Sequence, residues 1–183
     1  MLKNKTLTTS CSWLGAFLLL CEPAFAENKK LTQFGDYGQI GVPLTAGAIS
    51  LYKGDYEGFG QVLEGALYTS IAAHTLKYTV NEERPDGSNR QSFPSGHTSA
   101  AAQGAAYLQF RYGWQYGLPA YAITGVVGYS RVQAHKHYWH DVIAGALLAT
   151  GIQYAVTVKG YSFVNVAPYI TPDEVGLYAR MEF

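Results

Sequence analysis

Residues 130–141 combine a histidine, a carboxylate and a cation in a spacing that suits phosphate chemistry. His137 precedes Asp141 by four residues, about one turn of a helix, so the carboxylate can reach back to one imidazole nitrogen. That contact would fix the tautomer of His137 and leave the other ring nitrogen free as a nucleophile. Arg131 adds a positive charge to the same segment.

A second segment, Pro94-Ser95-Gly96-His97, opens a run of small residues that predicts a helix. Ser95 is suited to cap this helix, and Gly96 lets a ligand approach the backbone closely. The free N–H groups of a helix N-terminus attract anions, and His97 could there donate a proton to a leaving oxygen. Alone, the segment is equally compatible with an ordinary turn.

Two cations lie at the end of an earlier predicted helix. Lys77 is followed seven residues later by Arg84-Pro85, and the proline is expected to stop the helix and fix the arginine at its exit. A lysine point charge beside an arginine fork is a pairing expected around phosphate. Taken alone, both residues also fit an ordinary charged surface.

A metal site is the competing interpretation of residues 130–141, because His135, His137, His140 and Asp141 are all of zinc-ligand type. His135 and His140 do not obviously share a helical face with His137 and Asp141. We therefore expect no metal ligand and no cofactor, and we expect His74, His135 and His140 to be structural.

Apolar stretches predict the helices that must position these residues. They cover residues 42–52, 60–80, 97–111, 117–132 and 138–158, after an extended polar entry at 27–41. From Val175 to Phe183 the apolar residues alternate, which predicts a strand paired with residues 161–170. This hairpin would cover the bundle or, alternatively, dock on a membrane or another chain.

The first 26 residues have the pattern of a secretory signal peptide. Lys3 and Lys5 precede an apolar run at 13–20 that ends at Ala24-Phe25-Ala26, and an uncleaved anchor is the alternative. We predict export, with a bacterial periplasm as the compartment. Both cysteines lie in this segment, so the mature chain has no disulfide. The domains expected are a signal peptide at 1–26, a helical domain at 27–159 and a hairpin extension at 160–183.

Composition narrows the partners. Of 183 residues, 48% are hydrophobic and 14% charged, which excludes a disordered chain. Thirteen basic residues balance thirteen acidic ones, so no broad surface attracts nucleic acid. The longest uncharged runs, 112–130 and 142–158, are borderline for a bilayer, and we favour a soluble or peripheral membrane-associated bundle over a multi-span protein. The oligomeric state is left open.

Together, the three segments resemble a known family. Lys77-x6-Arg84-Pro85, Pro94-Ser95-Gly96-His97 and Ser130-Arg131-x5-His137-x3-Asp141 match, in order and spacing, the signature of the type 2 phosphatidic acid phosphatases. Bacterial acid phosphatases and vanadium haloperoxidases belong to the same superfamily. The resemblance covers roughly residues 42–158 and implies an all-α helical bundle with a phosphatase site at helix ends.

The resemblance also implies a metal-free, two-step hydrolysis. His137 would form a phosphohistidine, Asp141 would orient it, and His97 would protonate the leaving group and then activate water. The phosphoryl oxygens would be held by the five residues Lys77, Arg84, Ser95, Gly96 and Arg131. The predicted substrate is a phosphomonoester or pyrophosphate, expected to be a lipid or isoprenoid phosphate, with a soluble ester left open. The alternatives are a vanadium-dependent haloperoxidase and a non-catalytic phospholipid-binding protein.

Overall fold

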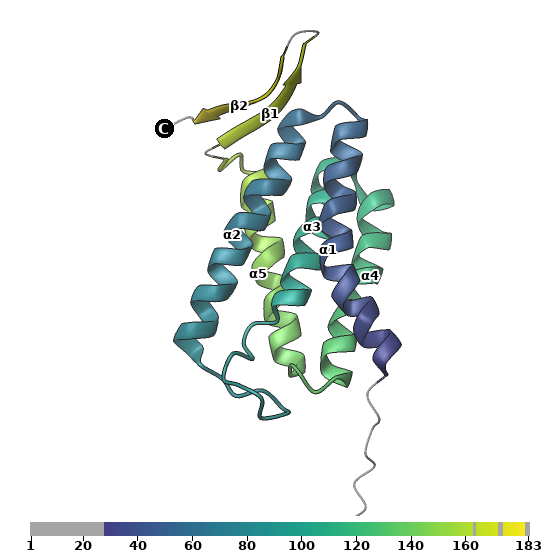
Figure 1. The fold of residues 1–183 in the computed structure, drawn as a ribbon, viewed down its shortest axis with the longest axis vertical. Coiled ribbons are helices and arrows are strands. Elements are labelled where there is room, and N and C mark those ends of the chain that lie inside the picture. Colours follow the sequence, from purple (N-terminus) through teal and green to yellow (C-terminus); the bar gives the residue numbers. More distant parts are fainter. Residues whose placement is uncertain (1–27, 163, 172–173, 182–183) are drawn as a thin grey trace, which may run out of the picture.

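The computed structural model describes residues 28–162, 164–171 and 174–181, which form a bundle of five helices followed by a two-stranded hairpin (Figure 1). The helices are α1 (Lys29–Tyr52), α2 (Tyr56–Val80), α3 (Gly96–Tyr112), α4 (Trp114–Gln133) and α5 (Trp139–Thr157). The strands are β1 (Val164–Ile170) and β2 (Val175–Met181), which pair antiparallel. The predicted all-α class with a C-terminal hairpin is confirmed. The predicted signal peptide lies outside the described residues.

The prediction of an extended segment at residues 27–41 is wrong, because α1 begins at Lys29. Asn28 caps this helix, and its side-chain oxygen accepts a hydrogen bond from the Leu31 N–H at 3.3 Å. Gly35 is buried where α1 meets Ser130 on α4. The glycines and polar residues that suggested an extended chain instead allow α1 to pack closely on its neighbours.

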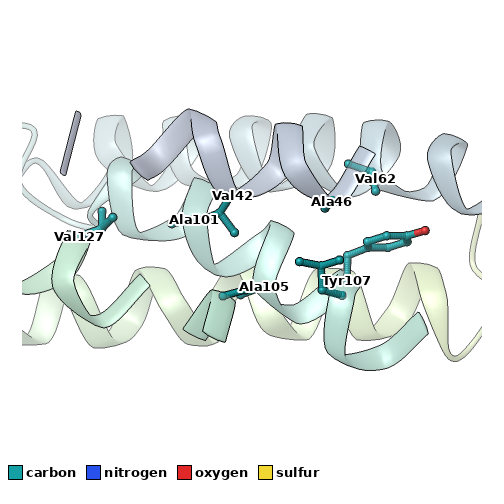
Figure 2. Close-up of a cluster of buried hydrophobic side chains, with 9 residues drawn as sticks. Val42, Ala46, Val62, Ala101, Ala105, Tyr107 and Val127 are labelled. Atoms are coloured by element: carbon teal, nitrogen blue, oxygen red, sulfur yellow. The ribbon is translucent and has the colours of Figure 1, made fainter. Parts of the chain in front are cut away.

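Helix α3 lies at the centre of the bundle and contacts all four other helices. Many of its inward residues are small, such as Ala101 and Ala105, which lets the helices approach closely, while Tyr107 fills the space beside them (Figure 2). A Cβ added to Gly104 would lie 2.7 Å from the Pro43 backbone of α1. A Cβ added to Gly145 of α5 would lie 2.7 Å from the Ser95 carbonyl oxygen. The spacing between helices therefore depends on residues without side chains at these crossings.

The end of α2 differs from the sequence prediction. Asn81 ends the helix in the left-handed conformation, with φ of 52°, and its N–H donates to the Lys77 carbonyl oxygen at 3.2 Å. Arg84-Pro85 follows in the connection to α3, so the proline does not stop the helix as predicted. Asn81 does so earlier, because asparagine tolerates this conformation better than most residues.

The two ends of the bundle carry different structures (Figure 1). The α2–α3 and α4–α5 connections lie together at one end, beside the beginning of α1. The hairpin lies at the opposite end, where β1 contacts α2. Within the described residues, no helix combines the length and apolar character needed to cross a bilayer.

Candidate active site

The predicted site residues come from four places that the fold brings to the same end of the bundle (Figure 1). These are the end of α2 with the following connection, the start of α3, the end of α4, and the connection into α5. They supply, in that order, Lys77 and Arg84, then Ser95, Gly96 and His97, then Arg131, and finally His137 and Asp141.

His137 is the most enclosed of the histidines in this site, with 3% of its surface exposed. Its Nδ1 lies 3.5 Å from Asp141 Oδ2 but has no hydrogen-bond partner among the described residues. Burial and the charges of Lys77 and Arg84 lower the pKa of His137 to about 4, although Asp141 and the Ser92 backbone oppose the shift. The imidazole is therefore neutral near pH 7, as a nucleophile must be.

Asp141 joins the separate parts of the site. Its Oδ2 accepts hydrogen bonds from the Ser92 hydroxyl at 2.6 Å and the Tyr138 N–H at 2.9 Å. Its backbone carbonyl accepts the Ser95 N–H at 3.0 Å, which ties the start of α5 to the start of α3. A single residue thus contacts His137 and holds the turn that carries His97.

Lys77 anchors the connection that leads into α3. Its ammonium donates to the Pro94 carbonyl at 2.6 Å and the Gln91 carbonyl at 2.9 Å. Burial and the charge of Arg84 lower the pKa of Lys77 to about 8, although Asp141 opposes the shift. Lys77 therefore shapes the loop as well as adding charge, a role that the sequence did not predict.

Arg84 is the central cation of the site. Its charge contributes to lowering the pKa of three neighbours, Lys77, His97 and His137. Its Nε is buried and has no hydrogen-bond partner among the described residues. A guanidinium with a buried, unused donor is well suited to take an anion.

Ser95 caps α3 as predicted, and its Oγ accepts the Thr98 N–H at 3.4 Å. Gly96 lies close to Lys77, since a Cβ added to it would be 3.8 Å from the lysine Cε. A cavity of about 110 Å³ between α2 and α3 reaches both Lys77 and Gly96. The start of α3 and the end of α2 therefore border one space.

His97 and Arg131 share a partner that sequence reasoning missed. Asp36 Oδ1, on α1, lies 3.1 Å from His97 Nε2 and 2.9 Å from Arg131 Nη1. Arg131 also donates to the Thr32 carbonyl at 2.7 Å. Burial and the charge of Arg131 lower the pKa of His97, while Asp36 opposes that shift. Arg131 is thus bound to α1 rather than held free for a ligand.

Nothing near Asp36 in the sequence signals this contact. It precedes His97 by 61 residues and Arg131 by 95. The contact requires α1 to pack tightly on α4, and Gly35 permits it, because a side chain there would collide with Ser130 and with Arg131 Nη2.

The remaining histidines do not form the four-residue metal cluster considered from the sequence. His74 Nδ1 contacts the Ser70 carbonyl within α2 at 2.8 Å, and His135 adopts a φ of 54° in the turn after α4. His140 does reach Asp141, and its Nε2 lies 3.1 Å from Oδ1. Of these three histidines, His140 is the one in contact with a predicted site residue.

Comparisons with known proteins identify the family of this chain. The family model of the PAP2 superfamily matches residues 59–162, more than half of the chain. A lipid A 4'-phosphatase of Helicobacter pylori is 30% identical over 157 residues, which cover 80% of this chain and 79% of that protein. A lipid A 1-phosphatase of Porphyromonas gingivalis is 34% identical over 109 residues, covering 55% of this chain and 24% of that protein.

A solved structure supports the fold. The crystal structure of Aquifex aeolicus LpxE aligns with a TM-score of 0.61 at 23% identity, covering 71% of this chain and 84% of that chain. The resemblance inferred from the three sequence segments is confirmed by the family match. The chain is a phosphatase and belongs to the PAP2 superfamily.

Proposed function

We propose that this chain hydrolyses a lipid phosphate without a metal, through a phosphohistidine on His137. The observation that carries the proposal is the buried, neutral imidazole of His137, placed between the Asp141 carboxylate and the charges of Lys77 and Arg84. Burying an imidazole, a carboxylate and two cations together costs free energy that packing alone does not return. A catalytic use is therefore the better explanation.

In the first step, His137 attacks phosphorus through Nε2, because Nδ1 faces Asp141. The N–P bond forms as the ester P–O bond breaks, and the electron pair stays on the leaving oxygen. His97 donates a proton to that oxygen. Asp141 stabilises the positive imidazole that results.

In the second step, His97 takes a proton from water, and the water oxygen attacks phosphorus. The N–P bond then breaks, which restores neutral His137 and releases inorganic phosphate. Charge on the phosphoryl oxygens would be stabilised by Arg84, Lys77, the Ser95 hydroxyl and the Gly96 N–H. Arg131 joins them once the phosphate replaces Asp36 as its partner.

The lipid assignment is supported by a groove beside the site. Its volume is about 450 Å³, it runs between α1 and α4, and its lining is mostly apolar. Phe34 and Tyr37 line it from the same turn of α1 that carries Asp36, the partner of His97 and Arg131, although none of these three residues lines the groove itself. An acyl chain in this groove would leave its phosphate at the end of the bundle. The names of the bacterial relatives make lipid A phosphates the first substrates to test.

The intermediate provides the first test. We expect rapid quenching with a ³²P-labelled substrate to trap a phosphoryl-enzyme that is stable in alkali and labile in acid. The label should map to His137 and be absent from His137→Gln. Turnover without label, or label on another residue, would contradict the mechanism.

A substrate panel tests the lipid assignment. We expect kcat/KM to be higher for lipid A and phosphatidic acid than for p-nitrophenyl phosphate, with isoprenyl pyrophosphate as a further member. A bulky Ile123→Trp change in the groove should narrow that preference and leave p-nitrophenyl phosphate hydrolysis unchanged. Equal loss on all substrates would place the lipid elsewhere. The relatives do not favour the haloperoxidase or the non-catalytic alternative.

A further inference from the structure

The outer side of Asp141 carries a group of ligands that the proposed mechanism does not use. His140 Nε2 lies 2.8 Å from Glu82 Oε1 and 3.1 Å from Asp141 Oδ1. The three ligand atoms all lie within 4.8 Å of one another. Glu82 comes from the connection after α2, while His140 and Asp141 come from the first turn of α5.

The hydrogen bonds of this group leave one oxygen without a partner. Asp141 is completely buried, and its Oδ1 accepts no hydrogen bond from the described residues although it faces His140. A single proton on His140 Nε2 serves Glu82 and cannot also serve Asp141 well. Oδ2 accepts hydrogen bonds from Ser92 and Tyr138 and faces His137, so Oδ1 is the oxygen that is open to a further partner.

We propose that Glu82, His140 and Asp141 bind a divalent cation of the zinc class, and that the bound ion inhibits the phosphatase. One imidazole nitrogen and two carboxylate oxygens form a ligand set that zinc accepts, with water in the fourth position. Ligand atoms around a tetrahedral zinc are about 3.3 Å apart. The 2.8 and 3.1 Å separations at His140 therefore need only a small expansion.

The site is accessible and its imidazole is oriented. The side chain of His140 is 58% exposed, so an ion can reach Nε2 from solvent. Its ring stacks on Tyr138 at 5.3 Å between centroids and lies 6.3 Å from the ring of Phe93. These aromatic contacts hold the ring with Nε2 toward both carboxylates.

Inhibition follows from the position of Asp141. In the proposed function its negative charge stabilises the imidazolium of His137, and a divalent ion on Oδ1 would offset that charge. The ion would also draw Glu82 toward α5. This consequence rests on the proposed function, whereas binding itself does not.

Binding is tested on the full chain by equilibrium dialysis against zinc in a buffer that does not chelate it. We expect one ion per chain in the wild type, and at least about tenfold weaker binding in Glu82→Gln and His140→Gln, since even outer-shell partners of a metal are worth 10–100-fold. Glu83→Gln is the matched control, because Glu83 adjoins Glu82 but pairs with Arg90. Circular dichroism of each variant checks folding.

Activity tests the second part. We expect saturating zinc to lower kcat of the wild type and of Glu83→Gln at least tenfold, and EDTA to restore it. Glu82→Gln should keep its activity in zinc. The proposed site would be overturned if the wild type did not bind zinc, or if Glu82→Gln and His140→Gln bound it as tightly as the wild type. Zinc binding without inhibition would overturn the inhibitory role. A wild type that binds zinc but hydrolyses no phosphate even in EDTA would count against the proposed function alone.

Discussion

Two polar clusters, one at each end of the helical bundle, differ in how far their atoms are paired. At the end near the hairpin, Asp55 accepts two hydrogen bonds from Arg111, at 2.8 and 2.7 Å, and one from the Tyr112 hydroxyl at 2.8 Å. Its Oδ1 also accepts the Gly58 N–H at 2.9 Å. At the other end, Arg84 Nε, His137 Nδ1 and Asp141 Oδ1 are buried without a partner among the described residues.

This contrast separates stability from chemistry. A polar network whose members are paired fixes the geometry of the chain, because each hydrogen bond replaces the water that was lost. Unpaired buried groups cost free energy, so three of them gathered in one place indicate use by a ligand or a reaction. We therefore expect changes near Asp55 to alter stability, and changes near His137 to alter turnover.

The largest expected effect is on the catalytic side of this contrast. His137→Ala should lower kcat/KM on the order of 10⁴-fold or more, because electrostatics alone cannot supply the nucleophile. Its melting temperature should stay near that of the wild type, since Nδ1 makes no hydrogen bond to lose. Steady-state kinetics and thermal melts measure both quantities. Near-normal turnover in this variant would remove the basis of the proposed mechanism.

The next effect distinguishes acid catalysis from phosphate binding at His97. His97→Ala should lower kcat/KM for an alkyl phosphate by about 10²–10⁴-fold, because an alkoxide needs a proton to leave. The loss should be much smaller for p-nitrophenyl phosphate, whose phenolate leaves without help. Single-turnover rates isolate the first step. An equal loss on both substrates would assign His97 to binding and make His135 the next acid to test.

At the opposite end, Arg111→Met should reduce the free energy of unfolding by about 1–3 kcal/mol, because hydrogen bonds to charged groups are worth more than neutral ones. We expect kcat to remain unchanged. Denaturant unfolding measures the loss. Arg90→Met is the matched control, since its pair with Glu83 is exposed on both sides and should contribute under about 1 kcal/mol. A large fall in kcat for Arg111→Met would contradict the expectation that this end of the bundle contributes to stability and not to turnover.

The smallest effects are those of pH. The rate constant kcat/KM should fall about tenfold per unit below the His137 pKa of about 4, because protonation blocks the nucleophile. His97 must carry a proton to act as the acid, and burial and Arg131 lower its pKa, so kcat/KM should first decline as that proton is lost. A second, upper limit follows above the Lys77 pKa of about 8, because the lysine charge is lost. Lys77→Arg should move this upper limit to higher pH. An unchanged upper limit would assign it to another group.

At the opposite end of the bundle, pH affects stability, and it does so in a more acidic range. Burial raises the pKa of Asp55, but hydrogen bonds from Arg111, Gly58 and Tyr112 outweigh it and lower the pKa to about 2. A carboxyl with a lowered pKa favours folding above its ordinary value of 3.8, and that contribution is lost as the pH falls from there toward 2. Asp55→Asn should flatten this acid dependence in unfolding experiments.

Local patterns in the sequence predicted much of the fold and the site. The contact of His137 with Asp141 and the cap at Ser95 each join residues three or four apart at the start of a helix, so the residue types and their spacing suffice. The alternation after Val175 likewise predicted the strand that pairs with β1. Such features depend on neighbours in the sequence.

Contacts between distant helices could not be predicted in this way. Asp36 reaches His97 and Arg131 only because α1 is helical and packs on α4 through Gly35. Glu82 meets His140 across 58 residues. Neither contact produces a periodic pattern in the sequence, because each depends on how the helices cross and not on which residues form the helices.

Gly145 allows the helix that carries Asp141 to lie close to the start of α3, where His97 is placed. It lies one turn beyond Asp141 on α5 and faces the Ser95 carbonyl, where a methyl group would be 2.7 Å from the oxygen. An alanine there would act as a wedge, pushing the helix that carries Asp141 away from the turn that carries His97. The distance between the nucleophile and the acid thus depends on the absence of a side chain at this position. Enlarging it would lower turnover although every reactive group stayed in the chain.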